Sequence, residues 1–211
     1  MSVLRICYLG EPVLRAKAEP IAEITEDLVC LAHDMIETML EEPGLGLAAP
    51  QVGDSRRLVV LRIISPSDEE EEEAAEDDEE DDEEIEVQAL VNPEIVEACD
   101  DVLVSREGCL SLPTLYGDVP RARQVVVRAV TVAGDEIEIH AEGLMARILQ
   151  HELDHLDGTV FLDRADPDTL VWLVPDEDEE SGHREDPTTV EQALARFERL
   201  AHKRASRGEQ D

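Results

Sequence analysis

Aromatic residues and lysine are nearly absent from this chain of 211 residues. Aromatic side chains make up only 2% of the sequence, while hydrophobic residues reach 42%. A folded core must therefore be built from Leu, Ile, Val and Ala, and the length is enough for one domain with a sizeable core. Only Lys17 and Lys203 are lysine among 18 basic residues.

Positive charge is scarce, because 18 basic residues face 53 acidic ones and the formal net charge is -35. Such a surface repels phosphate backbones, which argues against direct nucleic-acid binding. Two interpretations of the acidity compete: a solubility device for salty cytosol, and an acidic interaction segment. Because acidic residues lie throughout the chain and lysine is rare everywhere, we favour adaptation to high salt.

The chain also lacks a disulfide pattern, a signal peptide and an apolar run long enough to span a membrane. Its four cysteines are widely spaced, at Cys7, Cys30, Cys99 and Cys109. We therefore expect a cytoplasmic protein without membrane contact, in which the thiols stay reduced. A thiolate is then available as a metal ligand.

The most informative segment reads HExxH and runs from His151 to His155. Apolar residues recur at helical spacing between Gly143 and Gly158, so an α-helix is predicted. Two histidines four residues apart project from nearly the same face of a helix and can bind one divalent metal ion. Glu152 is then close enough to act as general base on water. The alternative is a helix whose histidines cap it or pair with nearby acids.

A third metal ligand is expected upstream, because no His or Glu follows at the spacing of zinc peptidases. The best donor is Cys109. A run of small residues, 44–53, allows the backbone to approach a ligand closely. It does not match a phosphate-binding loop, since the spacing is wrong and no Lys-Ser/Thr follows. Gln51 is the polar side chain in this run and can donate to a developing oxyanion.

The remaining pattern predicts an α+β fold, with antiparallel or mixed sheets packed around the HExxH helix and further helices near both ends. One helix is expected over 25–42, where Thr25 is a good N-cap, and another over 187–206. A turn is expected at Asn92-Pro93, and an antiparallel hairpin follows later in the chain. The predicted strands are 57–64, 85–91, 94–104, 123–132, 136–140 and 160–162.

Two acidic segments interrupt this pattern. Residues 68–84 are all acidic except Ala74 and Ala75. Like charges at this density repel each other and cannot bury surface. We therefore expect a disordered insertion at 68–84, and a second flexible acidic patch at 176–187.

Three segments, in order, resemble the signature motifs of the peptide deformylase family. They read GLGLAAPQ at 44–51, EGCLS at 107–111 and QHELDH at 150–155. The resemblance covers roughly residues 1–165, which would form the catalytic domain around the acidic insertion. Residues 166–211 would form a C-terminal extension.

The resemblance implies hydrolysis of the N-terminal formyl group from the initiator N-formylmethionine of nascent polypeptides, with release of formate. It implies Cys109, His151 and His155 as ligands of one divalent metal ion. That ion would be Fe²⁺ in the usual active form, with Zn²⁺ or Ni²⁺ as substitutes. Glu152 would be the general acid and base.

The resemblance also implies that the Gln51 side chain and the Leu110 backbone N–H hold the oxyanion, and that Gly46 lies along the bound peptide. We expect the apolar side chains of Leu144 and Ile148 to line the pocket for methionine. Nascent N-formylmethionyl peptides are the expected partner, the ribosome surface is a candidate docking partner, and a monomer is expected.

Three other functions stay open from the sequence. HExxH favours a zinc endopeptidase, although the missing downstream ligand argues against it. The acidic run favours a non-enzymatic binding protein, such as a cation buffer or a histone-chaperone-like module. A deformylase-like paralogue that acts on another N-acyl group would carry the same motifs. Release of formate from formyl-Met-Ala separates deformylation from cleavage of an internal peptide bond.

Overall fold

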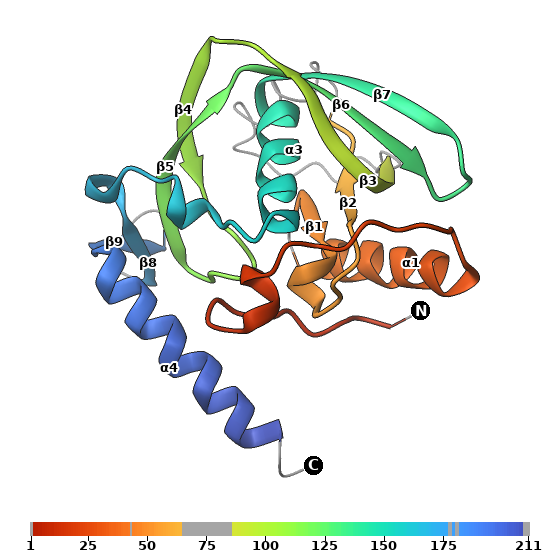
Figure 1. Cartoon of the computed structure of the whole chain (residues 1–211). Coiled ribbons are helices and arrows are strands. Elements are labelled where there is room, and N and C mark those ends of the chain that lie inside the picture. The colour runs from red at the N-terminus through yellow and green to blue at the C-terminus, as the bar shows by residue number, and fades with distance from the viewer. Residues whose placement is uncertain (1, 43, 65–85, 177–178, 180–181, 209–211) are drawn as a thin grey trace.

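A computed structural model describes residues 2–42, 44–64, 86–176, 179 and 182–208 of the chain, with side chains as far as Arg204. Two β-sheets lie on either side of helix α3 (Gly143–Leu156), and two more helices pack at the periphery (Figure 1). The predicted α+β class is confirmed. The predicted insertion at 68–84 lies outside the described residues.

The first sheet has five strands in the order β1-β2-β3-β6-β7, and each neighbouring pair is antiparallel. The predicted hairpin is confirmed as β6 and β7. β2 is buried along most of its length because its run of Leu and Val packs on both faces. The strands are β1 (Gly46–Ala48), β2 (Leu58–Arg62), β3 (Val87–Ala98), β6 (Gln124–Thr131) and β7 (Glu136–Glu142).

The turn predicted at Asn92-Pro93 is wrong, because β3 continues through these residues. The pairing of β3 with β6 shifts register between Val91 and Glu94, and Asn92 there has a φ of 51°. The Asn92 side chain bonds both the N–H and the carbonyl oxygen of Ile21, each at 2.8 Å. The residues that signal a turn therefore form a bulge within one strand.

The second sheet has the order β4-β5-β8-β9, again antiparallel. β4 lies at its edge and exposes three consecutive apolar residues, Val102, Leu103 and Val104. The strands are β4 (Val102–Glu107), β5 (Leu115–Ala122), β8 (Val171–Pro175) and β9 (His183–Pro187).

Two predictions fail in this part of the chain. The flexible patch expected at 176–187 is wrong for its last five residues, which form strand β9; β9 pairs with β8, and its Arg184 bonds Asp176 and Asp186. Residues 177–178 and 180–181 of that patch lie outside the described residues. The strand expected at 160–162 is instead a 3-10 turn, Phe161–Asp163. The Asp163 carboxylate accepts a hydrogen bond from the Val160 N–H at 2.9 Å and so closes that turn.

The helices follow the predicted pattern. α1 (Glu26–Glu41) starts after Thr25, whose hydroxyl accepts a hydrogen bond from the Leu28 N–H at 3.3 Å. Its apolar face packs with β2 and β3 in one core cluster. α4 (Val190–Gly208) packs through Ala193 and Phe197 on a second cluster with Trp172 of β8. α3 packs on the five-stranded sheet in a third cluster.

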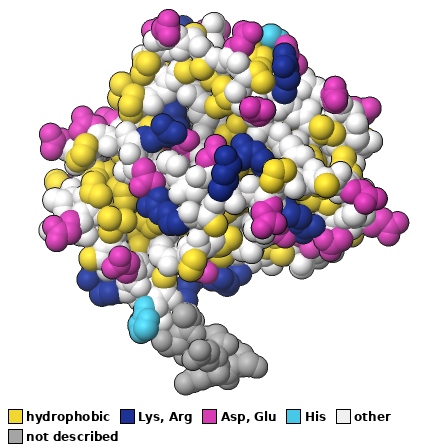
Figure 2. All heavy atoms as spheres, viewed as in Figure 1, with side chains coloured by type: hydrophobic (Ala, Val, Ile, Leu, Met, Phe, Trp, Pro, Cys, Tyr) yellow, Lys and Arg dark blue, Asp and Glu magenta, His cyan; other side chains and the backbone are white. Residues whose placement is uncertain are grey.

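Acidic side chains are frequent on the face of the molecule that Figure 2 draws. Figure 2 shows them scattered across the visible face among basic and apolar groups. Within the described residues, no helix combines the length and apolarity that crossing a bilayer requires.

Replacing Asn92 tests the bulge in β3. Asn92→Ala should lower the free energy of unfolding by about 2–4 kcal/mol, because it loses two hydrogen bonds and places Ala at positive φ. Asn92→Gly loses the same bonds but adopts that φ freely, so it should cost roughly 1 kcal/mol less. Urea denaturation of both variants measures the difference. Equal costs would contradict a strained backbone at this position.

Candidate metal centre

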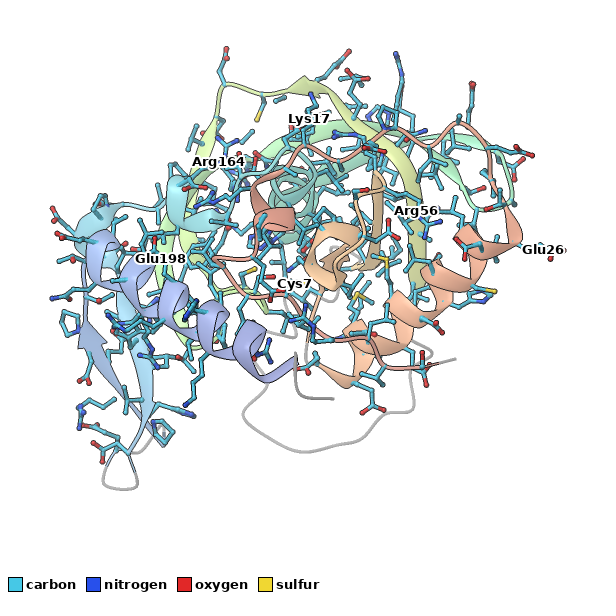
Figure 3. The ribbon with its side chains drawn as sticks, turned by 60° about the horizontal axis from the view of Figure 1, so that its bottom comes forward. Cys7, Lys17, Glu26, Arg56, Arg164 and Glu198 are labelled. Carbon is cyan, nitrogen blue, oxygen red and sulfur yellow. The ribbon has the colours of Figure 1, made fainter. Side chains whose placement is uncertain are left out.

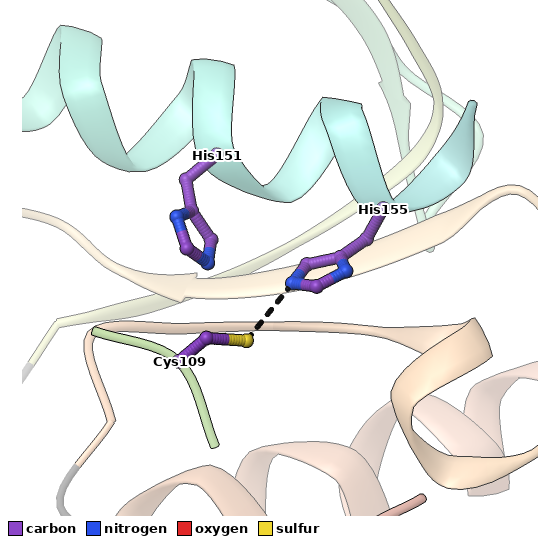
Figure 4. Close-up of side chains that lie close together, drawn as sticks. All are labelled: Cys109, His151 and His155. Carbon is purple, nitrogen blue, oxygen red and sulfur yellow. Dashed lines mark hydrogen bonds between the residues drawn. The ribbon is translucent and has the colours of Figure 1, made fainter. Parts of the chain in front are cut away.

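Helix α3 and the segment after β4 bring three metal-ligating side chains together. His151 and His155 lie one turn apart on α3, with ring centroids separated by 5.1 Å. Cys109 approaches them from the other side, and its Sγ lies 3.2 Å from Nε2 of His155 (Figure 4). One donor atom from each of the three residues lies within 4.8 Å of the others.

The histidines are prepared for ligation in different ways. Nδ1 of His151 lies 2.8 Å from the Glu107 carboxylate, which holds a proton on Nδ1 and makes Nε2 the ring nitrogen that would ligate a metal ion after losing its proton. His155 is fully buried, and burial holds its pKa well below the usual value, so the ring is neutral. Burial lowers the pKa of His151 too, but hydrogen bonds to Cys109 and Glu107 outweigh burial and raise it.

The Glu107 carboxylate is the group shared by most contacts of a buried ionic network. It accepts hydrogen bonds from Arg121 of β5, at 2.9 and 3.0 Å, and from Arg147 of α3, at 2.7 Å. Arg121 also donates to Asp154 of α3. Burial alone would raise the pKa of Glu107, but the bonds from His151 and Arg121 hold it well below its usual range.

Glu152 and Gln51 face the same centre. The Glu152 carboxylate is buried, and in the described part of the chain its Oε2 has no hydrogen-bond partner. Burial raises the pKa of Glu152 to about 7. The Gln51 amide is oriented by the Ala48 N–H, which donates to Oε1 at 2.7 Å, while Nε2 lies 3.5 Å from Sγ of Cys109. The amide N–H group is therefore directed at the thiol.

Gly46 of β1 allows this arrangement by its lack of a side chain. A Cβ at Gly46 would lie 2.7 Å from both Cγ and Oε1 of Glu152. Backbone and carboxylate are thus in direct contact, and any larger residue would displace the carboxylate.

A cleft of about 530 Å³ opens beside these groups. The structure brings all the residues predicted from the sequence to one place, although His155 is not among those that line the cleft. The predicted residues that line it are Gly46, Gln51, Cys109, Leu110, Leu144, Ile148, His151 and Glu152.

The ionic network was missed from the sequence. Glu107 and Asp154 lie within the motif segments, but no local pattern there predicts that they pair with Arg121. A signal exists for Arg121, which is a charged residue at a buried position of the alternating strand β5. A charge at such a position requires a buried partner.

Comparison of the sequence with known proteins finds similarity to a single enzyme family. A family model described as "Polypeptide deformylase" matches residues 3–170. The chain is 43% identical over 181 residues to a peptide deformylase of Thermomicrobium roseum, which covers 86% of this chain and 96% of that one. It is 43% identical over 164 residues to a peptide deformylase of Halothermothrix orenii, which covers 78% of this chain and 94% of that one.

Solved structures give the same similarity. The crystal structure of peptide deformylase from Thermotoga maritima matches with a TM-score of 0.66 at 36% identity, covering 79% of this chain and 100% of that one. The peptide deformylase from Ehrlichia chaffeensis in complex with actinonin matches with a TM-score of 0.68 at 35% identity, covering 79% and 90%.

Replacing Arg121 tests the buried network. Arg121→Met should lower the free energy of unfolding by about 3–5 kcal/mol, because it leaves two buried carboxylates short of a counter-charge. The matched control is Arg164→Met. Arg164 binds the same Asp154 but its side chain is 49% exposed, against 4% for Arg121, so it should cost about 1 kcal/mol or less. Urea denaturation with a chelator present compares them, and similar costs would refute the role given to burial.

Proposed function

The chain belongs to the peptide deformylase family, and on that premise we propose how its own residues remove the formyl group from nascent polypeptides. It is a hydrolase of protein biosynthesis. One observation carries the assignment of residues. Donor atoms of Cys109, His151 and His155 meet within 4.8 Å, next to the buried carboxylate of Glu152.

The three donors fit a single divalent cation. One thiolate and two imidazoles suit Fe²⁺, Zn²⁺ and Ni²⁺, and the carboxylate behind His151 is the usual support of a ligating histidine. We assign Fe²⁺ as the resident ion, with Zn²⁺ or Ni²⁺ as substitutes, on the strength of the resemblance to the family. When bound, the cation supplies Lewis acidity and the activation of water at neutral pH.

Glu152 moves the proton in this mechanism. Its carboxylate takes a proton from the attacking water and passes it to the amide nitrogen of methionine, whose bond to the formyl carbon breaks as formate leaves. The Gln51 amide and the Leu110 backbone N–H donate to the developing oxyanion. The hydrogen bond from Ala48 supports this role of Gln51, because it holds the amide in one orientation before the substrate binds.

The cleft walls support a methionine pocket. Leu144 and Ile148 present apolar side chains from α3, about two turns and one turn before His151. Gly46 offers backbone at the position where the peptide would pass Glu152. A site this close-packed would accept formyl, the smallest acyl group, and exclude larger ones.

Further features of the protein rest on the same premise. We propose that residues 1–165 form the catalytic domain around α3 and that residues 166–211 are an extension. We place the protein in the cytoplasm as a monomer, with the ribosome surface as a docking partner, because nascent chains emerge there. The spread of acidic side chains supports adaptation to high salt.

Glu152→Gln tests the mechanism. The wild-type protein, purified anaerobically and assayed at high salt, should release formate from formyl-Met-Ala and no acetate from acetyl-Met-Ala. Glu152→Gln should lower kcat by about 10²–10⁴ with the metal content unchanged, because the proton carrier is lost. Glu94→Gln, an exposed carboxylate outside the cleft, is the control. Absence of formate from the wild type refutes the function, and a fully active Glu152→Gln refutes the role of Glu152.

Gly46→Ala tests the position of the carboxylate. The new Cβ would displace Glu152, so kcat/KM should fall about 10²-fold while the fold is retained. Gly134→Ala is the contrasting variant, because Gly134 has a φ of +94° but a Cβ there meets nothing within 4 Å. That variant should lose stability and keep its activity. If Gly46→Ala has wild-type kcat/KM, the carboxylate does not depend on the glycine.

A further inference from the structure

The N-terminal strap, residues 6–9, forms part of the cleft wall. Ile6 and Tyr8 line the cleft together with residues of the metal centre. The apolar body of a tyrosine and a neighbouring isoleucine offer contact area to a bound peptide. The strap is irregular in backbone conformation, so its position depends on what it is bonded to.

Two backbone hydrogen bonds tie the strap to the motif segments on its inner side. The Cys7 N–H donates to the carbonyl oxygen of Gln51 at 2.7 Å, and the Leu9 N–H donates to the carbonyl oxygen of Ser111 at 3.0 Å. The strap therefore bridges the segment that carries Gln51 and the segment that carries Cys109 and Leu110.

Helix α4 holds the strap from its outer side. The guanidinium of Arg204 lies 3.7 Å from the centroid of the Tyr8 ring, and its Nη1 donates to the carbonyl oxygen of Ile6 at 2.9 Å. A Cβ at Gly10 would lie 2.9 Å from Cβ of Ala201, so chain and helix are in close contact. Figure 3 shows α4 running beside this segment, with Glu198 on the helix and Cys7 on the segment.

One side chain thus contacts both cleft-lining residues of the strap. Stacking of a guanidinium on an aromatic ring and a charge-assisted hydrogen bond both fix orientation. The helix is also anchored by apolar contacts, because Phe197 and Ala193 are fully buried in the cluster around Trp172, which Leu9 of the strap joins. Arg204 can therefore transmit the fixed position of α4 to the cleft wall.

We propose that Arg204 is a positioning residue that sets the affinity of the cleft for the peptide, acting through Ile6 and Tyr8. The inference rests on the proposed function. It concerns KM more than kcat, because the Gln51 amide is held separately by the Ala48 N–H. Preorganising a binding wall lowers the ordering cost of association and leaves the chemical step to other groups.

The helix contains a matched control. Arg196 stacks on Trp172 at 4.0 Å, the same type of contact as that of Arg204 on Tyr8. Trp172 is not among the residues that line the cleft. A change at Arg196 therefore removes one contact between α4 and β8, while Ala193 and Phe197 keep the helix in place and the strap is not touched directly.

The experiment compares Arg204→Gln, Arg204→Lys and Arg196→Gln with wild type, using formate release from a formyl-Met tripeptide. Arg204→Gln should raise KM about fivefold to tenfold, with kcat within about twofold of wild type. Arg204→Lys keeps the charge and one donor and should give an intermediate KM. Hydrogen exchange at the Cys7 and Leu9 amides should be faster in Arg204→Gln. Arg196→Gln should lower the melting temperature and leave KM unchanged.

An unchanged KM in Arg204→Gln, or an equal rise in Arg196→Gln, overturns the inference. To separate this result from failure of the proposed function, the peptide's dissociation constant is also measured directly in the Glu152→Gln background with and without Arg204→Gln. A weakening of the same size supports the inference whether or not turnover is observed. The inference is overturned if Glu152→Gln and the double variant have equal dissociation constants, or if neither protein binds the peptide.

Discussion

The structure of the centre depends on a single buried carboxylate. Glu107 lies two residues before Cys109, and it bonds His151 and Arg147 of α3 and Arg121 of β5. The segment that carries the sulfur and the helix that carries the imidazoles are therefore joined by the same group. Because this carboxylate is almost wholly desolvated, each of its bonds is strong and each missing partner would be costly.

This constraint explains the plan of the fold. The motif segments come from β1, from the end of β4 and from α3, which lie far apart in the chain. Backbone ladders fix each sheet, but neither sheet alone fixes the gap between Cys109 and α3. Arginine is suited to that task, because its fork of donors can bond two carboxylates at once, as Arg121 does with Glu107 and Asp154. The scarcity of lysine is compatible with this use of arginine.

The sequence predicted what local periodicity encodes. The helix of the HExxH motif, the Thr25 cap and the β6–β7 hairpin depend on residues within one or two turns, and they were recognised. The ionic network was not, since its partners lie 14–44 residues apart and meet only in the folded chain. Strand β9 was missed because its acidic composition indicates flexibility, whereas pairing with β8 decides its structure. At Asn92-Pro93 the local turn signal was real but produced a bulge.

The edge strand β4 gives the molecule an exposed strip of three apolar side chains. Exposed apolar strips of this kind favour association with another chain. With a net charge of -35 on each molecule, two copies repel each other strongly in dilute buffer, and that repulsion guards the strip. Dissolved ions shorten the range of the repulsion and strengthen apolar attraction. The tendency of this protein to associate is therefore governed by the balance between charge repulsion and apolar attraction. Strand β4 is the place where two molecules would first make contact.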